Sequence, residues 1–302
     1  MSEPTVPRPP GEEGFMNAVS YQAKPDVSDP IVLCAFAGWN DGGEGATNAL
    51  RTAREQWGSV SFASIDPEEF YDFQVHRPSV RLVGGRTRRI DWPANEFSWA
   101  RVAGRYVVVF IGVEPNVRWR TYCQQILAVC SELGASVLVT LGAFLADVPH
   151  TVPAPVSASS GHRSWASRPG IVPAQYEGPT GIVGVLNDLA LRAGVPAVSI
   201  WAASPHYLPQ MTNPKVTLAL LERMRDLLEL EIDTGAVDLA ARSWQREVDD
   251  AIEQDGNLGD YVKRLEDAAE QGLVADPSDV PSGEDLAAEL ERYLRERGSN
   301  DD

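Results

Sequence analysis

The chain has 302 residues, 43% of them hydrophobic, and a formal net charge of −17 at pH 7. This length and apolar share are sufficient to bury the core of a large α/β domain. The negative charge disfavours nucleic acid and anionic membrane surfaces as partners, and every apolar run is far shorter than the roughly 18 residues of a membrane span.

The charge is concentrated towards the C-terminus. Residues 222–302 contain 24 acidic and 9 basic side chains, a net charge of −15, which leaves −2 for the first 221 residues. The proline-rich and acidic residues 1–28 are expected to be a disordered lead-in. We therefore predict an α/β core domain at 29–221 and an acidic helical appendage at 222–302.

The location is predicted to be cytoplasmic. The N-terminus has neither the basic start nor the apolar stretch of a secretory signal. The three cysteines, Cys34, Cys123 and Cys130, include no CxxC pair and lie in apolar or helical contexts. They are expected to be reduced thiols within the core.

Strands and helices alternate along the predicted core. The pattern predicts, in chain order, a strand at 31–37, a helix at 48–57, a strand at 60–66, a hairpin within 71–93 around Gly84-Gly85, a strand at 105–113, a helix at 119–133, a strand at 136–144, a helix at 183–192 and a strand at 197–203. Beyond Asn213-Pro214, helices are expected at 214–232, 236–254, 257–271 and 283–297.

Strands separated by helices imply βαβ crossovers. The predicted fold class is therefore α/β, with a mainly parallel mixed sheet flanked by helices, to which the hairpin adds a mixed edge and the C-terminal helices an appendage. In such a sheet the loops that leave the carboxyl ends of the strands meet at one edge, where ligands bind. The segment 149–175 is rich in proline and serine, and a lid over this edge is one interpretation of it.

Carboxylates and imidazoles in these loops are candidates for an acid/base site. The candidate catalytic residues are Asp41, Glu114, Asp147, His150, Glu177 and His206. The candidate ligand-binding residues are Asn40, Gly42, Tyr176, Gly178 and Thr180.

Structural roles compete with catalysis for several of these residues. Asp41 is well placed to cap the following helix, Glu114 precedes another helix start, and each of His150 and His206 stands beside a proline in a rigid turn. The four histidines are scattered singly and no HExxH motif occurs. No metal site is predicted, and no cofactor is expected.

The glycine-rich turn "FAGWNDGGEGATNAL" (36–50) follows the first strand, where a phosphate cradle would lie. It lacks the Gly-Lys-Ser/Thr ending, and Asp41 and Glu44 would repel an anion. Its glycines are interpreted as a tight turn. A basic cluster lies instead on the predicted hairpin, where it would meet an acidic partner, a phosphate, acidic helices of the same or a neighbouring subunit, or solvent alone; it comprises Arg77, Arg81, Arg86, Arg88 and Arg89.

Several ordered motifs resemble the proteasome assembly chaperone 2 family. They are "GWNDGGEGATNAL", "FYDFQVHRPSV", "GVEPNVRW", "LGAFLADVPHT" and "YEGPTGIVGVLN", spread over about residues 30 to 210. The resemblance implies an α/β fold akin to the purine nucleoside phosphorylases and a homo-oligomeric habit. It also implies relatives that bind proteasome α-subunits.

Two functions follow from these observations. The first is a non-enzymatic, cytoplasmic protein-binding factor that contacts proteasome subunits or another protein partner. The alternative is a small-molecule hydrolase or phosphorylase of nucleosidase type, which would use the carboxylate and histidine candidates at the edge of the sheet.

Overall fold

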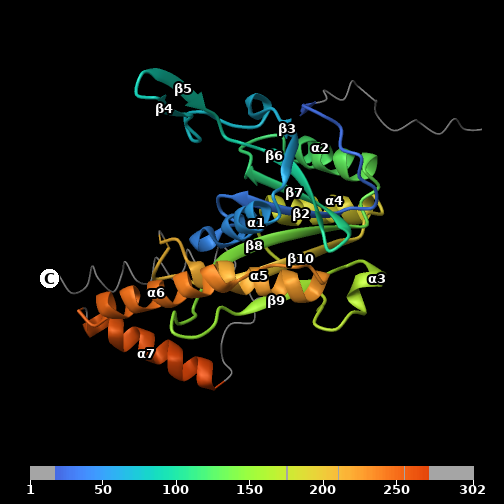
Figure 1. The fold of residues 1–302 in the computed structure, drawn as a ribbon. Coiled ribbons are helices and arrows are strands. Elements are labelled where there is room, and N and C mark those ends of the chain that lie inside the picture. The colour runs from blue at the N-terminus through green and yellow to red at the C-terminus, as the bar shows by residue number, and fades with distance from the viewer. Residues whose placement is uncertain (1–17, 175, 210, 255, 272–302) are drawn as a thin grey trace, which may run out of the picture.

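The computed structural model describes residues 18–174, 176–209, 211–254 and 256–271 (Figure 1). Its centre is a mixed eight-stranded sheet with the strand order β1-β3-β6-β7-β2-β8-β10-β9. The strands are β1 (Val19–Tyr21), β2 (Ile31–Ala37), β3 (Val60–Ile65), β6 (Glu96–Val102), β7 (Arg105–Val113), β8 (Val137–Ala146), β9 (Val156–Ser159) and β10 (Ala197–Pro205).

The four central strands are parallel, as the sequence predicts. β2 pairs in parallel with β7 and with β8, and β8 pairs in parallel with β10. Six of the seven residues of β2 are buried, because both faces of the sheet are covered. Leu33 and Ala35 pack on one face, while Val32, Cys34 and Phe36 pack on the other. The predicted α/β class is confirmed.

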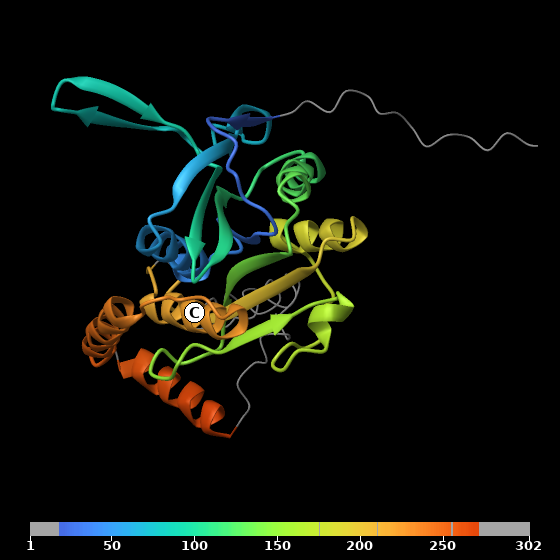
Figure 2. The same ribbon diagram turned by 45° about the vertical axis from the view of Figure 1, so that its right-hand side comes forward.

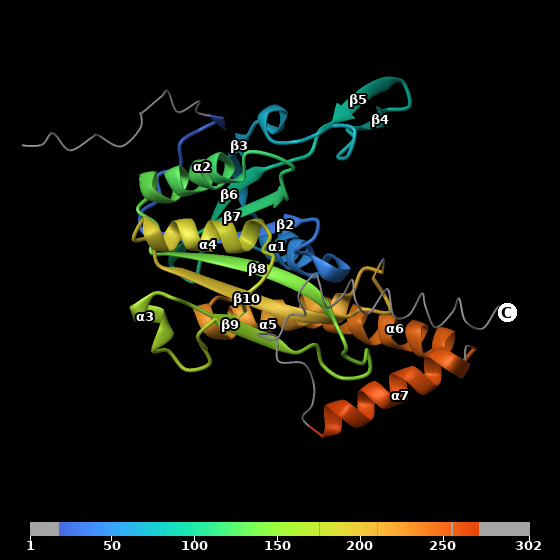
Figure 3. The same cartoon turned by 180° about the vertical axis from the view of Figure 1, so that it is seen from behind.

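Two pairs of helices cover the sheet. α1 (Gly45–Gln56) and α5 (Pro214–Leu228) lie on one face, and α2 (Trp119–Glu132) and α4 (Ile182–Arg192) lie on the other (Figures 1 and 3). Asn213 caps α5 by accepting hydrogen bonds from the backbone N–H groups of Lys215 and Val216, at 3.0 and 3.4 Å. The three cysteines are free and buried.

The predicted hairpin exists, but it is not an edge of the main sheet. β4 (Ser79–Val83) and β5 (Thr87–Asp91) form a separate two-stranded sheet that projects from the body (Figure 2). All but one of their residues are exposed, including apolar side chains such as Leu82, and Arg81 and Arg89 both pair with Asp91. Antiparallel pairing of β1, β3, β6 and β7 supplies one edge of the mixed sheet instead.

Three segments differ from their predicted organisation. β1 lies within 1–28, which we expected to be disordered, and it pairs with β3. The segment 149–175 contains β9 and the short helix α3 (Arg163–Ala166). α5 spans the predicted boundary at 221, and its residues beyond it, including Met224 and Leu228, are part of the core that also contains α1.

Two further helices, α6 (Gly235–Ile252) and α7 (Gly256–Glu270), extend from the end of α5. Their apolar faces form a small core of Trp244, Val248, Ile252 and Val262, which packs against Tyr207 and neighbouring residues at the end of β10. The helix predicted at 283–297 lies outside the described residues. Within the described part of the chain, no helix is both long and apolar enough to cross a membrane.

Candidate functional site

Asp41 follows β2 and lies at the start of α1. Its carboxylate accepts hydrogen bonds from the N–H groups of Ala46 and Thr47, at 2.7 and 3.2 Å, and from the Thr47 hydroxyl at 2.5 Å. Burial raises the pKa of Asp41, and these donors oppose that rise because they stabilise the charged form. In this arrangement Asp41 caps the N-terminus of α1.

Glu114 follows β7 and caps the N-terminus of α4. Its Oε1 atom accepts a hydrogen bond from Asn40 Nδ2 at 2.7 Å and another from the N–H of Ile182, the first residue of α4, at 2.9 Å. A Cβ atom at Gly181 would lie 2.2 Å from Asn40 Oδ1, so glycine is needed for this close approach. The Glu114 carboxylate therefore connects the loops after β2 and β7 to the start of α4.

His150 joins the loop after β8 to α6. Its Nε2 atom lies 2.9 Å from Asp249 Oδ1 and its Nδ1 atom lies 2.7 Å from the Tyr207 hydroxyl. Burial raises the pKa of Tyr207 to about 12, so the hydroxyl remains protonated and donates to Nδ1. His150 is therefore neutral, with its proton on Nε2 and shared with the Asp249 carboxylate.

Lys215 strengthens this junction. Its ammonium group donates to the backbone carbonyl of His150 and, at 2.9 Å, to Gln245 Oε1 on α6. Burial lowers the pKa of Lys215 to about 8. The side chain thereby connects the first turn of α5 to α6 and to the loop after β8.

Acidification is expected to destabilise the folded protein through the protonation of His150. Burial lowers the pKa of His150 below its ordinary value of 6.5, so the unfolded chain takes up the proton first as the pH falls. The contribution of His150 to the free energy of unfolding is therefore fully present above pH 6.5 and decreases below it. Urea denaturation between neutral and mildly acidic pH should show a smaller decrease for His150→Gln, and equal pH dependence in both proteins would contradict the assignment.

A second contact joins the same edge to α7. His206 Nδ1 lies 2.9 Å from Asp147 Oδ1, and the Tyr261 hydroxyl on α7 lies 3.3 Å from the same oxygen. The hydrogen bond from His206 lowers the pKa of Asp147. Thr151 donates to Glu266 on α7 at 2.6 Å. Asp147, His150 and His206 thus lie together, and all three contribute to the attachment of α6 and α7.

The remaining candidates lie apart from this attachment. Glu177, Gly178 and Thr180 are exposed, and the Tyr176 hydroxyl donates to the Pro179 carbonyl at 2.8 Å. A Cβ atom at Gly42 would lie 3.3 Å from the backbone of β8. The six candidate catalytic residues therefore do not form one constellation: Asp41 and Glu114 cap helices, three residues hold α6 and α7, and Glu177 faces solvent.

The sequence did not single out Lys215 or Asp249. Asp249 is one of several acidic residues on α6, and no motif distinguishes it from the others. Lys215 lies directly after the Asn213-Pro214 helix start. This motif predicts its position in the first turn of the helix but not the groups that it contacts. Among the described residues, no group of three or more histidine, cysteine, aspartate or glutamate side chains is arranged to hold a metal ion.

The fold and this edge define an α/β protein whose strand ends are occupied by contacts with helices. A model of the PAC2 family matches residues 35–252. The chain is also 46% identical to a PAC2 family protein from Streptomyces avermitilis, with a TM-score of 0.73 over 78% of this chain and 100% of that chain. The chain belongs to the PAC2 family, which confirms the resemblance seen in its motifs.

Two other solved structures are similar. A proteasome-assembly chaperone homologue from Mycobacterium tuberculosis is 44% identical, with a TM-score of 0.70 over 77% of this chain and 99% of that chain. PbaB from Pyrococcus furiosus, an archaeal proteasome activator, is 17% identical, with a TM-score of 0.62 over 78% of this chain and 99% of that chain. The second likeness shows the fold alone. A search of curated proteins found no match.

Proposed function

We propose that the protein is a non-enzymatic protein-binding factor that contributes to proteasome assembly or regulation. The main support is its 44% identity to a proteasome-assembly chaperone homologue, which it matches over 99% of that chain. The partner would be a proteasome subunit, and the protein would act in the cytoplasm as a homo-oligomer.

The use of the edge residues supports binding over catalysis. A hydrolase or phosphorylase needs several acid/base groups directed at one substrate. Here Asp41 is occupied by backbone and hydroxyl donors of α1, and Glu114 is occupied by Asn40 and the first N–H of α4. The geometry gives no support to the enzymatic alternative.

The projecting hairpin supports contact with another protein. Val80 and Ile90 are directly opposite each other, so they share a face of the hairpin with Leu82. These side chains are 59%, 53% and 63% exposed, respectively. An isolated two-stranded sheet is only marginally stable in water, and a partner that covered this face would stabilise it.

The proposal is tested by capture of purified proteasome α-subunits on the immobilised protein. We expect capture above a blank surface, and we expect Leu82→Ser on the hairpin to reduce it. Leu239→Ser provides a matched control, because Leu239 is 67% exposed on α6 and lies outside the hairpin. Absence of capture by the unmodified protein would contradict the proposal, and equal loss in both variants would remove the hairpin from the contact surface.

A further inference from the structure

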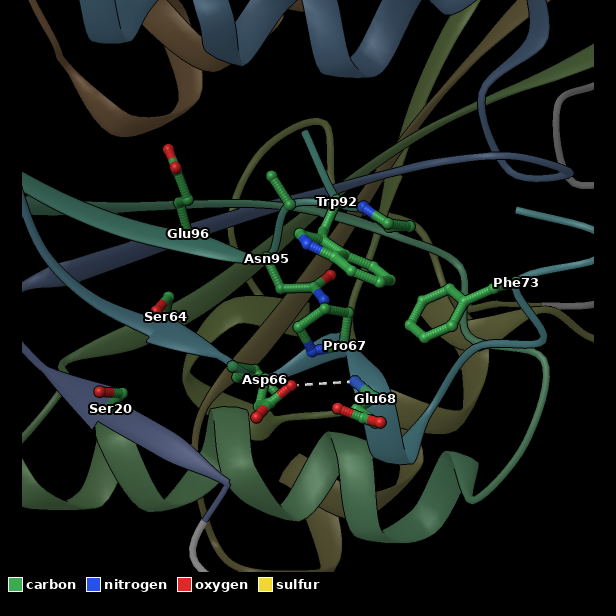
Figure 4. A pocket seen from close by; sticks show the side chains of 12 residues that line it. Ser20, Ser64, Asp66, Pro67, Glu68, Phe73, Trp92, Asn95 and Glu96 are labelled. Carbon is green, nitrogen blue, oxygen red and sulfur yellow. Dashed lines mark hydrogen bonds between the residues drawn. The ribbon is translucent and has the colours of Figure 1, made fainter. Parts of the chain in front are cut away.

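A hollow of about 500 Å³ lies beside the antiparallel strands β1, β3 and β6 (Figure 4). It is bounded by the 3-10 turn Pro67–Glu69 and by Phe73 and Trp92, the residues on either side of the hairpin. The six residues proposed from the sequence as catalytic candidates do not line it. Its floor and walls have three features that together specify a ligand.

The first feature is a buried donor with no partner. Asn95 is 1% exposed, and its Oδ1 atom accepts hydrogen bonds from the hydroxyls of Tyr71 and Tyr122, both at 2.7 Å. The N–H of Val113 also donates to this atom, at 3.2 Å, which fixes the orientation of the amide. Asn95 Nδ2 has no hydrogen-bond partner among the described residues.

Asn95 lines the hollow, and Figure 4 shows its amide between Trp92 and Pro67. A buried donor without an acceptor is costly, so its presence in a folded protein calls for a physical explanation. A ligand with a carbonyl oxygen directed at Nδ2 would satisfy it.

The second feature is negative charge. The described residues that line the hollow include Asp66, Glu68 and Glu96 but no lysine, arginine or histidine. One Asp66 oxygen accepts from the N–H of Glu68 at 3.0 Å, and Glu96 is paired with Arg54 at 3.2 Å. Glu68 is exposed at the mouth. This surface repels anions and attracts a cation.

The third feature is an aromatic wall. The rings of Phe73 and Trp92 are in edge contact, with centroids 4.8 Å apart and an interplanar angle of 62°. Trp92 is 51% exposed, so part of the indole is open to a ligand. A planar guanidinium group stacks on such a ring and forms paired hydrogen bonds with carboxylates, which an ammonium group does less well.

We propose that this hollow binds an arginine residue of a polypeptide. The guanidinium group lies against Trp92 and close to Glu68, and a peptide carbonyl of the same segment accepts a hydrogen bond from Asn95 Nδ2. This proposal goes beyond the proposed function, because it names the chemical group that binds in the hollow and does not depend on a proteasome subunit as the partner.

Titration with synthetic peptides tests this site. Binding is measured by calorimetry and by changes in the NMR signals of the Asn95 side-chain amide. The peptide acetyl-Ala-Arg-Ala-amide is expected to bind with a Kd on the order of 1 mM or below and to shift these signals. The citrulline peptide, which has the same shape without the charge, is expected to bind about tenfold more weakly.

Two exposed carboxylates provide matched variants. Glu68→Gln is expected to weaken binding of the arginine peptide several-fold, whereas Glu55→Gln on α1, which removes the same charge away from the hollow, leaves it unchanged. Equal affinity for the arginine and citrulline peptides, or no binding of the arginine peptide at several millimolar, would overturn the proposal. The result is independent of α-subunit capture, since no proteasome component is present.

Discussion

Replacing Glu114 with alanine is expected to lower the free energy of unfolding by about 3 kcal/mol, since each buried donor left without an acceptor costs about 1–3 kcal/mol. The two donors are Asn40 Nδ2 and the N–H of Ile182. Asn40 is almost fully buried, so water does not replace the lost acceptor. Urea denaturation of the two proteins measures the difference directly.

Glu114→Gln is the control for this prediction. The amide retains one oxygen that accepts from the same donors, so the loss should be about 1 kcal/mol, with the difference due to the removed charge at the N-terminus of α4. If the alanine variant unfolds at the same urea concentration as the unmodified protein, Glu114 does not cap α4. The residue would then be free for the catalytic role predicted from its position.

The second large effect is expected from Gly45→Ala at the contact between α1 and α5. A Cβ atom at this position would lie 2.2 Å from Val216 Cγ1 and 2.9 Å from Val216 Cβ. Gly45 and Val216 are both fully buried or nearly so, and the two helices must separate to admit the methyl group. We expect a destabilisation of about 3 kcal/mol, measured by urea denaturation.

Gly256→Ala is a matched control, because a Cβ atom there has no heavy atom within 4 Å. It should leave the stability unchanged or raise it by up to about 1 kcal/mol, since alanine favours a helix over glycine. Combining Gly45→Ala with Val216→Ala removes the closest clash, so the double variant should lose less than the sum of the two single losses. Additive losses would show that the two residues are not in conflict.

The central strands could be predicted because burial on both faces requires continuous apolar runs. Segments such as Ile31–Ala37 and Arg105–Val113 have this pattern, and the structure places them side by side. β6 was missed because its alternating sequence, "EFSWARV", follows a proline-containing turn and resembles a loop boundary. β9 was missed because its four residues, "VSAS", form an edge strand with no long apolar run.

The position of the edge residues could be predicted, but their partners could not. Asp41 and Glu114 follow parallel strands, and that alone places them at the carboxyl edge. Glu114 contacts Ile182, which is 68 residues away in sequence, and His150 contacts Asp249, which is 99 residues away. Each pairing depends on how the helices pack on the sheet, and local sequence patterns do not predict that packing.

The polar side chains at the carboxyl edge hold helices to the sheet. Hydrogen exchange followed by mass spectrometry, applied to the unmodified protein, Glu114→Ala and His150→Gln, tests it most directly. We expect Glu114→Ala to lose amide protection at the start of α4 and His150→Gln to lose it in α6, with the other helix unaffected in each case. Unchanged protection in both helices of both variants would contradict the claim.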